Sequence, residues 1–188
     1  MGAIMVQFND LEDNELAFKA ARGDARAFEA LINRHYTTIF KFAYKFCGHK
    51  SRAEDITQNV CIKLARSLGS FEGSASFTSW LYRVVVTTAT DYMRKNARHG
   101  KMRIHIDPAL KGSSSVGEDR LHARQILEEI RNLPEGEREA VMLVFVEDMT
   151  HAQAAEIMGC AEGTVSWKIS EARKKLKYFE NRNDGGQQ

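Results

Sequence analysis

The hydrophobic positions of this chain follow a helical spacing almost from end to end. Apolar residues recur three and four positions apart, which aligns their side chains along one face of an α-helix. Two prolines, Pro108 and Pro134, are the only ones in the chain, so few positions break the pattern. We therefore predict an all-α protein.

The N-terminal half predicts four helices, each with a recognisable start or end signal. Asp24 is a candidate N-cap, Ser51 with Glu54 has the spacing of a capping box, and Gly23, Gly48 and Gly69 are candidate helix ends. The predicted helices run over about 14–22, 25–47, 51–68 and 77–98. The second carries a long apolar stripe and is expected to be the core helix; His35 on this face is expected to be a core residue with a polar partner.

Helical periodicity fails between His99 and Asp119, where Asp107-Pro108 and a glycine-serine run appear. Such a composition is typical of a flexible linker. We predict two small helical domains, at 12–99 and 120–182, joined by a linker at 100–119, with a disordered tail at 183–188.

The C-terminal half has the sequence pattern of a helix-turn-helix. After helices predicted around Leu127 and over about 135–146, the second with Phe145 among its buried residues, Thr150 and Gln153 have capping-box spacing. Gly159 ends that short helix, and a basic last helix runs over about 163–179. The second helix of such a pair can enter the major groove of DNA. The alternative is that the basic residues are only a solvated face.

Aromatic residues follow a loop of small residues in the first domain. Residues 70–76 contain three serines, and Phe77, Trp80 and Tyr82 come directly afterwards. Unpaired bases stack on aromatic rings, so this segment is a candidate site for single-stranded DNA. The alternative is structural, because Trp80 and Leu81 also fit the buried stripe of their helix.

Composition excludes several other classes of protein. The net charge of +2 and a pI near 8.4 are only mildly basic, so any DNA-binding surface must be local. Cys47, Cys61 and Cys160 form no CxxC pair, and Cys47 with His49 supplies at most two metal ligands. With no catalytic motif, signal peptide or long apolar run in the sequence, we predict a cytoplasmic non-enzyme without a metal, cofactor or membrane span.

Three stretches, in this order and spacing, resemble the extracytoplasmic-function (ECF) group of bacterial sigma factors in the sigma-70 family. They are SRAEDITQ at 51–58 with Lys63; FEG at 71–73 leading to FTSWLYRV at 77–84; and EGTV at 162–165 leading to EARKKL at 171–176. The resemblance covers nearly the whole chain. It implies a factor that binds RNA polymerase core and directs promoter recognition, melting and transcription initiation, and it implies control by an anti-sigma factor.

The resemblance also implies roles for individual residues. Polymerase core docking is expected at Asp55, Gln58 and Lys63. Capture of the melted −10 element is expected at Phe71, Ser74, Ser76, Trp80, Tyr82, Arg83 and Thr87. Recognition of the −35 element is expected at Thr164, Ser166, Trp167, Lys168, Ser170, Glu171, Arg173, Lys174 and Lys175.

Within the last helix, buried positions at Val165, Ile169, Ala172 and Leu176 would leave Trp167 and Glu171 facing outward. The chain departs from the family pattern at Asn59, Glu72, Thr87 and the triplet 166–168, which leaves its promoter sequence open. Two other readings remain: a stand-alone helix-turn-helix regulator whose N-terminal domain dimerises or senses a ligand, and an enzyme with a Cys/His metal site.

Overall fold

The computed structural model describes residues 8, 10–98 and 117–184, and all regular elements within these ranges are helical. The chain divides into two compact units, Met1–Arg103 and Ile104–Gln188. The prediction of an all-α protein built from two helical domains is confirmed. The proposed linker at 100–119 falls mostly outside the described residues, but helix α6 already begins at Gly117, inside that stretch.

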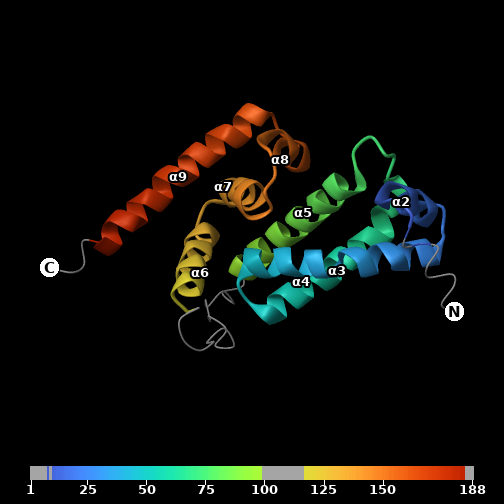
Figure 1. Ribbon diagram of the computed structural model, residues 1–188, viewed down its shortest axis with the longest axis horizontal. Helices are drawn as coiled ribbons and strands as arrows, with labels where there is room; N and C mark the ends of the chain where they lie inside the picture. Colours follow the sequence, from blue (N-terminus) through green and yellow to red (C-terminus); the bar gives the residue numbers. More distant parts are fainter. Residues whose placement is uncertain (1–7, 9, 99–116, 185–188) are drawn as a thin grey trace. The chain divides into compact units, whose positions relative to one another are not determined.

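The N-terminal unit is built around one long helix. Helix α3 (Ala25–Cys47) packs against α2 (Asp13–Ala21), α4 (Lys50–Ser67) and α5 (Phe77–Arg98), and a short 3₁₀ helix, η1 (Leu68–Ser70), follows α4. Figure 1 shows α2 beside the loop that joins η1 to α5, and α2 contacts both of these elements. The α2 helix therefore borders the candidate single-strand site.

Of the five predicted helix signals in this unit, three are confirmed and two are wrong. Gly23 follows the end of α2 with φ of 93°. The Asp24 carboxylate accepts hydrogen bonds from the backbone N–H groups of Arg26 and Ala27, at 3.0 and 3.1 Å. Gly48 ends α3 with φ of 72°, a conformation that costs glycine little. The expected Ser51 capping box does not form, because α4 begins at Lys50, which makes His49 the N-cap and places Ser51 inside the first turn. Gly69 lies within η1 instead of ending α4.

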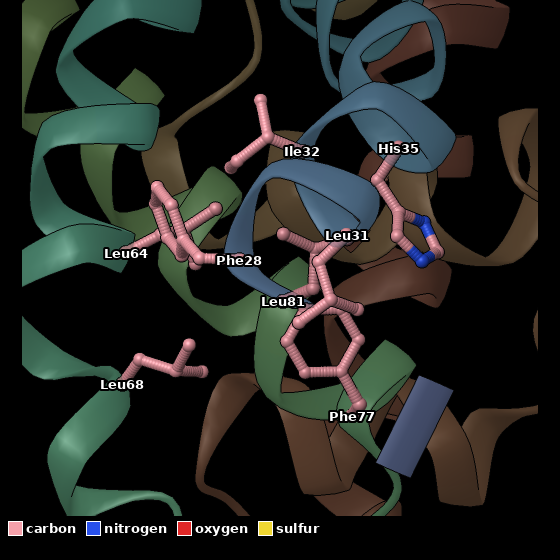
Figure 2. Close-up of a pocket in the computed structure, with 8 residues that line it drawn as sticks. All are labelled: Phe28, Leu31, Ile32, His35, Leu64, Leu68, Phe77 and Leu81. Atoms are coloured by element: carbon pink, nitrogen blue, oxygen red, sulfur yellow. The ribbon is translucent and has the colours of Figure 1, made fainter. Parts of the chain in front are cut away.

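The core of this unit forms where the apolar faces of α3, α4 and α5 meet. Phe42 and Phe46 of α3 are completely buried, as are Ile56 and Val60 of α4. This core contains a small cavity of about 10 Å³, which has room for at most one water molecule. Figure 2 shows the side chains that line it. It is lined by Phe28, Leu31, Ile32, His35, Leu64, Leu68, Phe77 and Leu81. These residues form packing, not a ligand site.

The C-terminal unit contains the predicted helix-turn-helix. It consists of α6 (Gly117–Arg131), α7 (Glu135–Val141), a π-helical segment η3 (Met142–Val146), α8 (His151–Met158) and α9 (Glu162–Asp184). Helices α7 and α8 both pack on α9 (Figure 1). Helix α9 is longer than predicted and includes residues 183 and 184 of the expected disordered tail. Residues 185–188 of that tail lie outside the described residues.

The π-helical segment changes which residues are buried. Met142 and Leu143 are in the core, but Phe145, which the helical pattern predicted to be buried, is 53% exposed. A π turn is wider than an α turn, so it rotates the residues at the end of the helix relative to an α-helical register. The predicted extent of this helix is right, and the prediction for Phe145 is wrong.

The Thr150 capping box provides a test of the local stability of α8. The Thr150 hydroxyl accepts from the Gln153 N–H at 3.2 Å, and the Gln153 side chain accepts from the Thr150 N–H at 2.9 Å. Thr150→Ala should lower the free energy of unfolding of this unit by about 1 kcal/mol. Urea unfolding followed by Trp167 fluorescence in a Trp80→Phe background measures it, with Thr37→Ala in α3 as control. Equal urea midpoints for Thr150→Ala and the parent protein would contradict the capping-box assignment.

Candidate nucleic-acid interface

The loop between η1 and α5 is held at both ends by an aromatic cluster. Phe71 is only 6% exposed, and its ring lies 5.3 Å from Phe18 of α2, 6.0 Å from Phe77 and 5.7 Å from Trp80. Offset and edge-to-face pairs at these centroid separations are favourable. The residues between the two ends, 72–76, remain largely on the surface.

The structure separates the predicted −10 residues into different environments. Ser74 is exposed in the loop, and Trp80 is partly exposed at its base. Phe71 is buried, so little of its ring is left for a base. The Ser76 hydroxyl accepts from the Ser79 N–H at 3.1 Å and thus caps α5. Tyr82 packs edge-on against Phe42 of α3, at 5.8 Å.

The remaining predicted positions form one exposed stripe on α5. Arg83 and Thr87 follow Trp80 at i+3 and i+7, which places the three side chains on the same face of the helix. Both Arg83 and Thr87 are exposed. The Thr87 hydroxyl donates to the backbone oxygen of Arg83 at 2.8 Å. The stripe begins at the loop, so one extended single strand of DNA could contact both the loop and the stripe.

The three predicted docking residues on α4 are all exposed, as expected for a contact surface. The Asp55 carboxylate accepts a hydrogen bond from the Tyr92 hydroxyl of α5 at 2.7 Å. Burial, and then this bond to Asp55, raise the pKa of Tyr92 to about 12, so Tyr92 remains a donor at neutral pH. Lys63 lies 3.6 Å from the Asp91 carboxylate. The helical pattern placed Tyr92 on α5 but did not reveal its contact with Asp55, because the two residues are distant in sequence.

The outward face of α9 is the candidate DNA-reading surface of the C-terminal unit. Val165, Ile169 and Ala172 are buried as predicted, whereas Leu176, also predicted to be buried, is only partly buried. Ser166, Ser170, Arg173 and Lys174 are exposed. Trp167 is 59% exposed, so most of its side chain is not covered by a neighbouring helix. Exposing this much apolar ring is unusual unless a partner covers it.

Two of the lysines predicted to contact DNA face the protein instead. The Lys168 side chain covers Gly136 at the start of α7, where an added Cβ would collide with its Nζ. The Lys175 ammonium pairs with the Glu137 carboxylate, which is only 7% exposed. A buried carboxylate requires such a counter-charge. Lys175 is thereby assigned a structural contact that the basic pattern of the helix did not reveal.

Other polar groups on this face have partners within the unit. Glu171 is partly exposed and accepts a hydrogen bond from Lys174 at 2.6 Å, which lowers the pKa of its carboxyl and keeps it an acceptor. The Arg173 guanidinium lies 5.5 Å from the centre of the Phe145 ring, a cation–π distance. The Ser166 hydroxyl lies 2.9 Å from Nδ1 of His151, and Thr164 is partly buried. The sequence did not point to His151, and it placed Phe145 in the core instead of beside Arg173.

Comparison with known families identifies both units. Residues 31–99 match the family described as Sigma-70 region 2, and residues 123–176 match Sigma-70, region 4. The chain is 30% identical over 178 residues to the RNA polymerase sigma-H factor of Pseudomonas aeruginosa, covering 88% of this chain and 92% of that protein. It is also 30% identical to the ECF RNA polymerase sigma-E factor of Escherichia coli, covering 88% of this chain and 93% of that protein.

Solved structures show the same fold. The chain matches CnrH, solved in complex with the cytosolic domain of CnrY, with a TM-score of 0.67 at 24% identity, covering 90% of this chain and 97% of that one. It matches the sigma factor RpoE of Bartonella quintana, solved with the anti-sigma factor NepR, with a TM-score of 0.62 at 24% identity, covering 84% of this chain and 98% of that one.

The two helical units and the helix-turn-helix define a DNA-reading initiation factor. The chain belongs to the ECF group of RNA polymerase sigma factors in the sigma-70 family.

Two further observations concern metals and membranes. The described residues contain no group of three or more His, Cys, Asp or Glu side chains placed to hold a metal ion. Cys47, Cys61 and Cys160 form no disulfide bond in the described part of the chain, and burial raises the pKa of Cys61. Among the described helices, none is both long and apolar enough to cross a membrane.

The contrast between Lys174 and Lys175 gives a direct test of the site geometry. Lys175→Ala should destabilise the C-terminal unit by about 3 kcal/mol, because it leaves the Glu137 carboxylate buried without its counter-charge. Lys174→Ala should change stability by less than about 1 kcal/mol, since its pair with Glu171 is exposed. Urea unfolding of each variant provides the measurement. Equal stability losses would mean that the Lys175 contact is not structural.

Proposed function

We propose that this sigma factor reads the −35 promoter element with the exposed face of α9 while bound to RNA polymerase core. One observation carries this proposal: α9 follows a capped helix and a glycine turn, and it presents Trp167, Ser170 and Lys174 on its free face. The width of the major groove admits a helix in this arrangement. Trp167 is suited to an apolar contact such as a thymine methyl group. Glu171 is suited to accept from cytosine N4, and Arg173 and Lys174 to meet phosphates.

The N-terminal unit supplies the second DNA contact in this proposal. The loop 72–76 and the stripe formed by Trp80, Arg83 and Thr87 take an unpaired segment of the −10 element. An aromatic ring at the loop base and a cation further along α5 suit stacked bases and their phosphates. Phe71 and Tyr82 support this surface through packing, and Ser76 also caps α5 at the end of the loop.

Helix α4 is the proposed docking surface for polymerase core. Asp55 and Gln58 share an exposed polar face, and Ile62, an exposed large apolar residue, lies on the same side of the helix at i+7 from Asp55. Interfaces commonly combine an apolar centre with polar neighbours. Tyr92 orients the Asp55 carboxylate through its hydrogen bond. Lys63, close to Asp91 of α5, lies at the edge of this face.

The remaining partners and the cellular setting follow from the same assignment. CnrH was solved with the cytosolic domain of CnrY, and RpoE with the anti-sigma factor NepR. We propose that an anti-sigma factor also controls this chain. The protein acts in the cytoplasm, where polymerase and promoter DNA are found. It works as a non-enzymatic factor that requires no metal or organic cofactor of its own.

In vitro transcription with bacterial core polymerase over a promoter library tests the function as a whole. The chain should direct initiation from a defined set of promoters only when core is present. A stand-alone regulator would instead bind duplex DNA specifically and tightly by itself. The small net charge of +2 argues against this alternative, because non-specific DNA affinity depends on phosphate neutralisation.

The docking assignment predicts a selective loss of polymerase affinity. Gln58→Ala and Asp55→Ala should each weaken binding to core by roughly threefold to tenfold, as for the loss of a polar interface contact of about 1 kcal/mol. Glu29→Ala, an exposed change on α3 instead of α4, is the matched control. A fluorescence titration gives the affinities and circular dichroism the helicity. Unchanged core affinity in both variants would rule out this face.

The promoter-reading assignment predicts different effects along α9. Glu171→Gln should shift the base preference at one −35 position by about 1–3 kcal/mol. Lys174→Ala should weaken all promoters alike and reduce the salt slope of binding by about one. A promoter-library selection with each variant holoenzyme measures both effects. The Glu171 assignment fails if Glu171→Gln returns the parental −35 consensus.

A further inference from the structure

The short helix α2 lies outside residues 31–99, the part matched to Sigma-70 region 2. It is nevertheless firmly attached to the N-terminal unit. Leu16 and Ala17 are completely buried. The Asp13 carboxylate pairs with Arg34 of α3 at 2.5 Å and with Nε2 of His35 at 2.9 Å. Helix α2 is therefore a fixed platform on α3.

Two residues of α2 reach the loop that carries the proposed −10 contacts. The Asn14 side-chain oxygen accepts a hydrogen bond from the backbone N–H of Phe77 at 2.7 Å. This N–H belongs to the first turn of α5, which has no intrahelical partner for it. Asn14 thus caps α5 from another helix, alongside the Ser76 hydroxyl that accepts from Ser79.

Phe18, four residues after Asn14, holds the other end of the loop. Its ring lies 5.3 Å from that of Phe71. It also lies against Gly73, where an added Cβ would be 2.5 Å from the Phe18 Cζ. Gly73 has φ of 72°, so it needs glycine for its conformation and for this close approach. Phe18 remains 41% exposed, because it covers the loop and not the core.

We propose that α2 is a positioning element for promoter melting, in which Asn14 and Phe18 hold residues 72–76 in one conformation. Four of these five residues are glycine, alanine or serine, whose small side chains provide little packing of their own. Fixing both ends of a short loop removes alternative conformations before DNA binds, and this reduces the entropic cost of binding. The inference rests on the proposed role of this loop, but the contacts that carry it belong to α2.

The first measurement uses the free full-length protein and needs neither polymerase nor promoter. Hydrogen–deuterium exchange of peptides covering 71–79 should accelerate about fivefold in Asn14→Ala, as expected for the loss of one capping interaction. A similar increase is expected in Phe18→Ala from the lost aromatic contact. Asn14→Asp keeps the acceptor oxygen and should retain slow exchange. Glu15→Ala, an exposed change on the same helix, is the control.

The second measurement follows function with bacterial core polymerase. Asn14→Ala and Phe18→Ala should bind core as the parent does, but form open complexes on duplex promoters about fivefold more slowly. A template already unpaired at the −10 element should reduce this defect only in part. Base discrimination within the −10 element should weaken, because a mobile loop accepts more than one base. Asn14→Asp should restore both properties.

The outcomes separate this inference from the proposed function. Exchange and open-complex rates equal to those of Glu15→Ala would overturn the positioning role while leaving the sigma activity intact. Lost core affinity together with lost helicity would also overturn it, by showing that α2 only stabilises the fold. Accelerated exchange in a protein whose parent form never initiates transcription would support the α2 contacts and contradict the function assigned to the loop.

Discussion

Burial of the apolar stripe of α3 is the interaction on which the N-terminal unit depends. Phe42 and Phe46 are completely buried and stack on each other at 5.7 Å, and replacing one such ring by alanine typically costs about 3–5 kcal/mol. Helices α4 and α5 cover this stripe with their own apolar faces. Their polar faces must then point outward, and these carry Asp55 and Gln58 on α4 and Arg83 and Thr87 on α5.

The functional segments are supported by residues that do not themselves face a partner. The loop 72–76 is small and polar, so its conformation depends on Phe71, Phe18 and Asn14 at its ends. The exposed face of α9 similarly depends on Val165 and Ile169 beneath it. Placing binding residues on surfaces held by a rigid scaffold is a general solution, because loops and polar faces contribute little packing.

The two lysines at 174 and 175 illustrate how neighbouring residues of one charge acquire different tasks. Successive residues on a helix point about 100° apart, so only one of them can face DNA while the other faces α7. Lys175 meets the buried Glu137 carboxylate, whereas Lys174 is exposed beside Glu171. A charge pattern therefore indicates that a helix is basic, but not which of its charges are available to a partner.

The sequence by itself determined the all-α class, the helix-turn-helix and most helix ends, because these depend on local spacing, caps and left-handed glycines. It also indicated that Val165, Ile169 and Ala172 face inward and Trp167 outward. Only the tertiary structure decided that Phe71 and Tyr82 are packed, that Lys168 and Lys175 face α7, and that Phe145 is exposed. Each of these depends on a neighbour distant in sequence or on a π-helical turn, which residue spacing along one helix does not encode. For the same reason the sequence alone does not indicate the roles of Asn14 and Phe18, because their partners lie more than fifty residues away in the sequence.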